Sequence, residues 1–264
     1  MKKIIDNFIK YRFLLLELIK KGIKLRYRRS YLGIIWTLLE PLLMTIVLYF
    51  VFGTLLGRNS TDAMPYAVYI LVGRLCFSYF STATRSCLKS IRSNAGMIKK
   101  VYVPKYLYPL SEALYNYIIF LISLIILVLT CLVLGVFPKF SWLLAIAPLI
   151  VLFLLSFGVG MILATIGVFF RDMEYLWTVV NTLIMYMSAI FYYPEQLFTD
   201  PNDWRFLILK LNPLYDVIAN FRACISGETF HTMYFLYSLA FSLTCCAVGI
   251  YFFFKKQDKF ILEI

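Results

Sequence analysis

The chain has 264 residues, of which 62% are hydrophobic and only 15% are charged. A soluble domain carries about a quarter of its residues as charged side chains, so the composition excludes a fold whose main surface faces water. The formal net charge of +12 would indicate nucleic-acid binding in a soluble protein, but in a membrane protein it indicates basic residues gathered on the cytoplasmic side.

The sequence lacks the motifs of catalysis, nucleotide binding and metal binding. No G-x-x-x-x-G-K-[ST] loop occurs, which excludes nucleotide binding by a P-loop. There is one histidine, no H-E-x-x-H and no G-x-S-x-G, and the six cysteines form no CxxC pair. We therefore expect no catalytic residue, metal site or cofactor in this chain, and we interpret the cysteines as packing residues.

Residues 1–31 predict a helix that lies in the membrane interface. Ten lysines and arginines alternate there with apolar residues such as Ile5, Phe8 and Leu15. A basic amphipathic helix of this kind lies along the membrane surface with its apolar side in the lipid. Its last basic run, residues 24–29, would then face anionic headgroups just before the chain enters the bilayer.

Six apolar segments follow that are long enough to span, because a spanning helix needs roughly 20 mostly apolar residues. They are residues 33–56, 65–88, 107–136, 141–170, 175–193 and 229–254. The second is the least apolar, since it contains Arg74 and Arg85. The fourth has no charge, and its Ser156, Gly160 and Ala164 recur every four residues, a pattern typical of close helix packing. We predict one all-α polytopic membrane domain over residues 1–264.

The basic residues of the connections predict the orientation. If the N-terminus is inside, the inner segments hold 19 of the 26 lysines and arginines and the outer connections hold five. Cytoplasmic connections carry such an excess. We therefore expect a multi-pass protein of the bacterial inner membrane with both termini in the cytoplasm.

The outer connection, residues 194–228, is long and unusually apolar. Asn212-Pro213 is a good helix start, because proline is favoured at the first helical position. We predict two short helices here, which dip back into the outer leaflet or cover a pore mouth. The candidate gate residues are Trp204, Pro213, Leu214 and Phe221.

Charged and aromatic residues within the spans are the candidates for a substrate path. Arg74 lies near the middle of the second span, where a charge suggests a functional role. It would face a water-filled conduit and contact phosphate or acidic sugars, or else form a salt bridge or reach the interface. The outer end of the fifth span offers rings that would either stack on sugars or form an interfacial belt. These are Tyr186, Phe191, Tyr192 and Tyr193.

At this point the chain resembles the membrane subunit of type-2 ABC exporters for cell-surface polysaccharides such as O-antigen and teichoic acid. The most specific match is residues 24–41, KLRYRRSYLGIIWTLLEP. Further matches follow in the expected order along nearly the whole chain. They are residues 94–104 with Pro109, residues 169–174 (FFRDME), residues 212–214 (NPL) and the basic tail 255–264.

The resemblance implies a homodimer paired with two cytoplasmic ATPase subunits that bind ATP and magnesium. The substrate would be a glycan on a polyprenyl pyrophosphate carrier. Arg26, Arg28 and Arg29 would meet its pyrophosphate, which needs cations, and the short outer helices would gate the exit. The inner connection, residues 89–106, would place a coupling helix in a groove of the ATPase. Its residues are Asn94, Ala95, Gly96, Met97, Ile98, Lys99 and Lys100.

Other functions fit parts of the same sequence. A membrane enzyme acting on polyprenyl-linked sugars would need reactive groups gathered on one side, and Asp172 with Glu174 is a small set. A secondary transporter would show inverted repeats, which we do not find in the sequence. An ABC exporter for drugs, haem or lipids remains an alternative, although the long match at residues 24–41 favours glycans.

Overall fold

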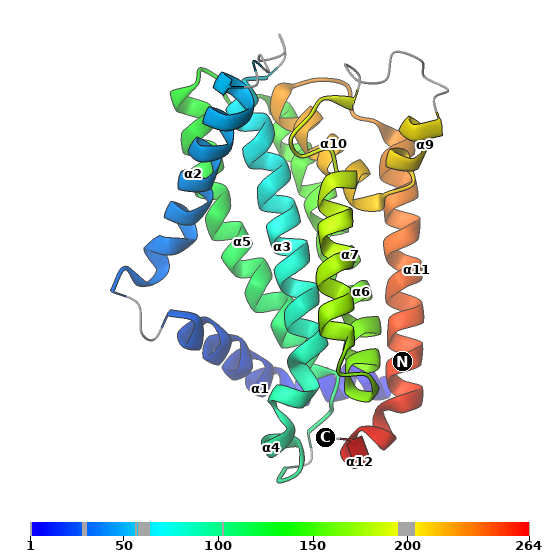
Figure 1. The fold of residues 1–264 in the computed structure, drawn as a ribbon. Helices are drawn as coiled ribbons and strands as arrows, with labels where there is room; N and C mark the ends of the chain where they lie inside the picture. Colours follow the sequence, from blue (N-terminus) through cyan, green and yellow to red (C-terminus); the bar gives the residue numbers. More distant parts are fainter. Residues whose placement is uncertain are drawn as a thin grey trace.

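The computed structural model describes residues 2–27, 31–55, 57, 64–101, 103–194 and 204–263. These residues form a bundle of long helices, with one further helix lying across one end (Figure 1). Within this part of the chain, five helical segments are long and apolar enough to cross a membrane. They are Gly33–Leu55, Tyr66–Ser93, Leu107–Val133, Phe140–Phe169 and Thr232–Glu263. The predicted all-α polytopic membrane fold is confirmed.

The long helices begin and end close to the predicted spans. The first span consists of a short 3-10 turn, Gly33–Ile35, then α2, and then a π-helical segment, Tyr49–Leu55. The fourth span likewise begins with a 3-10 turn, Phe140–Ala145. The main helices are α2 (Trp36–Leu48), α3 (Tyr66–Ser93), α5 (Leu107–Val133), α6 (Ile146–Phe169) and α11 (Thr232–Lys256).

The predicted fifth span is shorter in the structure than in the sequence analysis. Helix α7 covers Met173–Met187, which is 15 residues and fewer than the roughly 20 that a bilayer needs. Hydropathy continues beyond Met187, but the backbone turns at Ala189, whose φ is 47°. The Ala189 carbonyl accepts hydrogen bonds from Tyr69 and Arg222. These tertiary contacts hold the turn and end the helix.

Helix α1, Lys2–Tyr27, lies across the bundle at the end that also holds α4 (Ala95–Ile98) and α12 (Phe260–Glu263) (Figure 1). Leu18 is buried in a cluster that includes residues of α5, α6 and α11, whereas Phe13 is exposed. The predicted amphipathic helix is therefore present. The side of α1 that holds Leu18 packs on the bundle, and Phe13 faces outward.

Helix α6 packs closely against α3 and α11 because small residues face both neighbours. A Cβ added to Gly160 would lie 2.8 Å from the Sγ atom of Cys87 on α3, and one added to Gly158 would lie 2.6 Å from the backbone nitrogen of Cys246 on α11. Ser156 and Ala164 are fully buried. The predicted stripe of small residues on α6 is therefore a surface for helix packing. Cys87 is a free thiol that packs against this surface.

Two short helices occur between the fifth predicted span and α11, as predicted. They are α9, Trp204–Lys210, and α10, Pro213–Ser226. The Asn212 side chain caps α10 by accepting a hydrogen bond from the Leu214 N–H, at 3.1 Å. Both helices lie at the end of the bundle opposite α1 (Figure 1).

Candidate functional site

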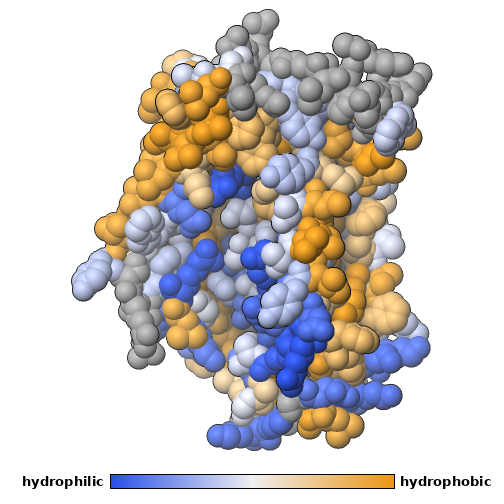
Figure 2. Space-filling model, viewed as in Figure 1, coloured by the Kyte–Doolittle hydropathy of each residue, from blue (hydrophilic) through white to orange (hydrophobic). Residues whose placement is uncertain are grey.

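A continuous row of polar residues runs along one side of α3. Most of this helix is buried, but the side chains at a spacing of three or four residues remain open to the surface. They are Arg74, Ser78, Ser81, Thr82, Arg85 and Lys89. Figure 2 shows hydrophilic surface down the middle of this side of the molecule, with hydrophobic surface over α2 and α7 beside it. We call these six residues the α3 polar row.

The flanking helices present apolar side chains outward. On α2, Ile46 and Val47 are more than half exposed, and on α7, Val179 and Leu183 are as well. Charged groups inside a bilayer are costly when they face lipid. The α3 polar row therefore requires water or protein in front of it, whereas the neighbouring faces of α2 and α7 suit lipid or another apolar surface.

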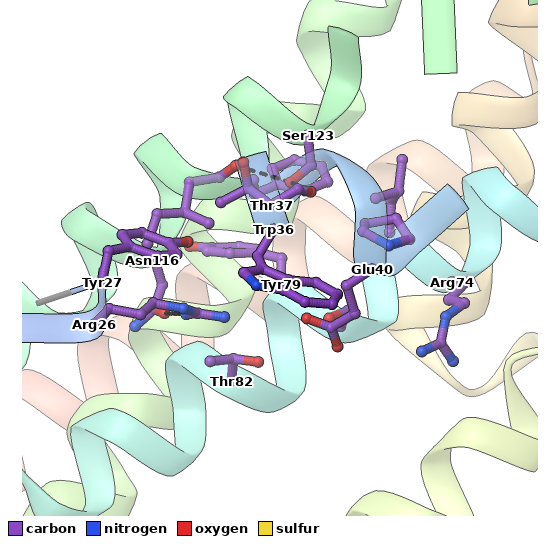
Figure 3. Close-up of a pocket in the computed structure, with 15 residues that line it drawn as sticks. Arg26, Tyr27, Trp36, Thr37, Glu40, Arg74, Tyr79, Thr82, Asn116 and Ser123 are labelled. Atoms are coloured by element: carbon purple, nitrogen blue, oxygen red, sulfur yellow. Dashed lines mark hydrogen bonds between the residues drawn. The ribbon is translucent and has the colours of Figure 1, made fainter. Parts of the chain in front are cut away.

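A polar pocket of about 90 Å³ lies where α1, α2, α3 and α5 meet (Figure 3). Arg26 lines it from the end of α1 and donates a hydrogen bond to Oδ1 of Asn116 on α5, at 3.2 Å. Glu40 on α2 and Arg74 on α3 line the same pocket. In the described part of the chain, neither Glu40 nor Arg74 makes a hydrogen bond or an ion pair. The pocket thus holds charges of both signs that remain available to a ligand.

This pocket brings together two residues that were predicted to belong to different parts of the substrate path. Arg26 was predicted at the substrate entry and Arg74 in the conduit, and both line one cavity that also includes Ser78 and Thr82 of the α3 polar row. Arg28 and Arg29, the other predicted entry residues, lie outside the described residues. The hydrogen bond between Arg26 and Asn116 joins α1 to α5.

A charged cluster marks the other end of the α3 polar row. Glu174, at the start of α7, forms an ion pair with Lys89, at 2.8 Å, and also with Arg92. The hydrogen bond from Lys89, followed by the positive charges of both residues, lowers the pKa of Glu174 below its ordinary value. The cluster borders a hollow of about 450 Å³ that Arg171 and Ala95 also line.

The predicted coupling segment forms a short helix beside this hollow. Helix α4 covers Ala95–Ile98, within the seven residues predicted. Ile98 is buried, so it anchors the helix to the bundle, while Gly96, Lys99 and Lys100 are exposed. The helix projects from the end of the bundle (Figure 1), which leaves its exposed side free for a contact.

The four predicted conduit aromatics have different surroundings. Tyr186 is 59% exposed, and its carbonyl accepts a hydrogen bond from the Tyr192 hydroxyl. The Phe191 ring stacks on Phe52, with 5.4 Å between centroids. Tyr193 is buried, and the centroid of its ring lies 4.3 Å from the centroid of the Tyr69 ring. This corrects the expectation for Tyr193, because its ring belongs to the core.

The predicted gate residues also divide into exposed and buried ones. Trp204 on α9 is 68% exposed, while Leu214 and Phe221 on α10 are almost fully buried. Helix α10 contacts α3, α6 and α11, so these two side chains anchor it in the bundle and do not line an open mouth. Pro213 occupies the first turn of α10, as predicted.

Arg222, one of the five basic residues of the predicted outer connections, is a structural residue. Its side chain is buried and donates hydrogen bonds to the carbonyls of Ala189 and Tyr69, both at 3.1 Å. The guanidinium lies 3.4 Å from the centroid of the Tyr69 ring. The partners of Arg222 are distant in sequence and only the fold brings them together.

Comparison with known proteins supports the family resemblance. The family model for ABC-2 type transporters matches residues 14–226. The chain is 30% identical over 251 residues to an O-antigen export system permease protein RfbA of Klebsiella pneumoniae, covering 94% of this chain and 93% of that protein. It is 30% identical over 225 residues to an RfbA of Myxococcus xanthus, covering 84% of each.

A more distant relative is named for a different substrate. The polysialic acid transport protein KpsM of Escherichia coli is 24% identical over 244 residues, covering 91% of this chain and 92% of that protein. The family match extends from α1 through α10 and so includes the α3 polar row, the pocket and α4. The chain therefore belongs to the ABC-2 type transporter family and is the transmembrane subunit of an ABC exporter.

Proposed function

We propose that this exporter subunit moves a polysaccharide, attached to polyprenyl pyrophosphate, across the cytoplasmic membrane. The α3 polar row carries the proposal. Hydroxyl, guanidinium and ammonium groups follow one another along a spanning helix, from Arg74 to Lys89, and such groups suit a hydrated glycan. The names of the relatives, which refer to O-antigen and polysialic acid, support the same cargo.

Two copies of the chain would enclose the conduit. One chain provides a polar wall on α3 with apolar surfaces on α2 and α7 beside it, but no described element covers the front of this wall. Most oligomers of identical chains are twofold symmetric. A second copy facing the first would bring two α3 polar rows together, and the apolar faces of α2 and α7 would close the sides.

The pocket beside Arg26 and Arg74 would receive the pyrophosphate of the carrier. A pyrophosphate is best held by charge-assisted hydrogen bonds from cations, and two arginines line this pocket. Glu40 lines it as well, and its negative charge would repel the pyrophosphate. We propose that this repulsion keeps binding weak enough for the carrier to move on into the conduit.

Energy would enter through α4. A separate ATPase, which binds ATP and magnesium itself, would contact the exposed side of α4 and the adjacent charged hollow. Lys99 and Lys100, which follow α4, and the lysines of residues 1–27 suit the cytoplasmic side, which is where we place both termini. At the opposite end, α9 would open and close the exit, and Trp204 and Tyr186 would contact sugar rings there.

Water access to α3 tests the proposal. In the complete exporter, with the six native cysteines replaced, single cysteines at Ser78, Ser81 and Thr82 should react with a membrane-impermeant thiol reagent. A cysteine at Ile125, which is 51% exposed on α5, serves as the lipid-facing control and should not react. Loss of glycan export on modification at Ser78, but not at Ile125, is the expected functional result. An unreactive α3 in an active exporter would refute the conduit.

A further inference from the structure

An apolar groove lies between α6 and α11, away from the α3 polar row. It has a volume of about 460 Å³. Its α6 side is formed by Ile162, Ile166 and Phe169, and its α11 side by Val248 and Phe252. Lys256, the last residue of α11, borders the groove at one end. The groove is therefore apolar along its length and positively charged at one end.

The length of the groove matches one leaflet of a membrane. From Val248 to Lys256 the helix rises about 12 Å, at about 1.5 Å per residue. The hydrocarbon core of a bilayer is about 30 Å thick, so one leaflet is about 15 Å. Lys256 ends a helix of 25 residues, which places its ammonium group at the depth of the lipid headgroups.

The Lys256 ammonium group is available for a ligand, whereas the ammonium group of the adjacent Lys255 contacts Tyr251. In the described part of the chain, Lys256 is exposed and makes no hydrogen bond or ion pair. The Lys255 ammonium lies 3.5 Å from the Tyr251 hydroxyl and 5.5 Å from the centroid of its ring. Two lysines adjacent in sequence thus have different surroundings, and only Lys256 borders the groove.

We propose that this groove binds one acyl chain of an anionic phospholipid, whose phosphate group contacts Lys256. The apolar walls suit the chain, the single cation suits the headgroup, and the groove is as long as one leaflet is deep. A bound lipid would fill the space between α6 and α11 next to the turn that leads into α7. The inference holds for any cargo, so it does not rest on the proposed function.

Two adjacent lysines provide a matched test. The purified full-length chain, depleted of lipid in detergent, would be titrated with phosphatidylglycerol and with phosphatidylcholine, and bound lipid counted by native mass spectrometry. We expect Lys256→Ala to weaken phosphatidylglycerol binding about five-fold and Lys255→Ala to leave it nearly unchanged. Equal losses in both variants would mean a general charge effect and would overturn the proposal.

Filling the groove tests the acyl-chain site separately. Val248→Trp should reduce the binding of both lipids, while Leu243→Trp, on an exposed part of α11 outside the groove, should not. If Val248→Trp leaves lipid binding intact but changes the oligomeric state, the groove is an interface between copies and the proposal is wrong. Neither result bears on glycan export, because the cysteine test above measures that independently.

Discussion

Glu174 at the start of α7 is joined to Lys89 near the C-terminal end of α3 by an ion pair of 2.8 Å. The same carboxylate contacts Arg92, nearly one turn further along α3. Helix α3 ends at Ser93 and α4 begins at Ala95. A force applied to α4 is therefore applied close to the contact between α3 and α7, the two helices that border the proposed conduit.

Glu174→Gln should weaken the link between α3 and α7. The substitution removes the negative charge from two partly exposed pairs, so we expect a loss of about 1 kcal/mol in the free energy of unfolding. Glycan export should fall further than stability alone explains, because the link transmits movement. Asp172→Asn, an exposed acid in the same turn, is the matched control for both thermal unfolding and export.

The same carboxylate predicts a pH dependence. Because the pKa of Glu174 is lowered in the folded protein, its ion pairs contribute their full stabilisation above the ordinary pKa of 4.5. That contribution is lost as the pH falls below 4.5 through the lowered folded value. The difference in unfolding midpoint between wild type and Glu174→Gln should be constant at neutral pH and shrink in acid. A difference that grows in acid would contradict this assignment.

Arg74→Ala should slow export without unfolding the bundle. Arg74 lines the pocket but makes no hydrogen bond or ion pair within the described residues, so its removal leaves no buried partner unsatisfied. Loss of one charged contact to the pyrophosphate corresponds to about a ten-fold lower rate. Arg74→Lys keeps the charge and should restore most of the export. Unchanged flux in the alanine variant, at normal expression, would assign Arg74 a purely structural role.

Arg222→Lys should destabilise the packing of α10 against the turn at Ala189 and against α3. A lysine ammonium lacks the planar guanidinium that contacts the carbonyls of both Ala189 and Tyr69. Loss of one hydrogen bond from a charged donor costs about 1.5–3 kcal/mol. Gly73→Ala should have a similar effect, since an added Cβ would lie 2.6 Å from the Arg222 Nη2 atom. Thermal unfolding of the purified chain measures both, and a neutral Arg222→Lys would show that one carbonyl contact suffices.

Gly158→Ala should loosen the contact between α6 and α11. The added methyl group would lie 2.6 Å from a backbone atom of Cys246, and overpacking of this kind costs about 1–3 kcal/mol. Gly96→Ala, where nothing lies within 4 Å of the added Cβ, should be neutral or stabilise α4 by about 0.5–1 kcal/mol. Equal effects of the two substitutions on the unfolding midpoint would contradict the packing argument.

Much of the fold could be predicted because hydropathy is a local property of the chain. The apolar segments at residues 33–56 and 141–170 and the Asn212-Pro213 helix start all have counterparts in the structure. The predicted fifth span is the exception. Its apolar residues continue beyond Met187, but hydrogen bonds from distant side chains turn the backbone at Ala189.

The candidate site was only partly predictable for the same reason. The cost of a charge in the membrane identified Arg74, but not its position in one pocket with Arg26 and Glu40. Aromatic composition suggested Tyr186 and Tyr193 equally, although one is exposed and the other is packed against Tyr69. Composition does not specify which side of a helix end faces the core.

The sequence by itself determined that this chain enters a membrane as helices and belongs with ABC-2 type transporters. Length, hydropathy and short motifs are sufficient for that, because each depends on neighbouring residues. Only the tertiary structure decided that six polar residues of α3 form one open row, that Glu174 joins α7 to α3, and that Arg222 holds the turn at Ala189. These relationships depend on how helices rotate and pack against one another, and packing joins residues as far apart in sequence as Tyr69 and Arg222, which are separated by 153 positions.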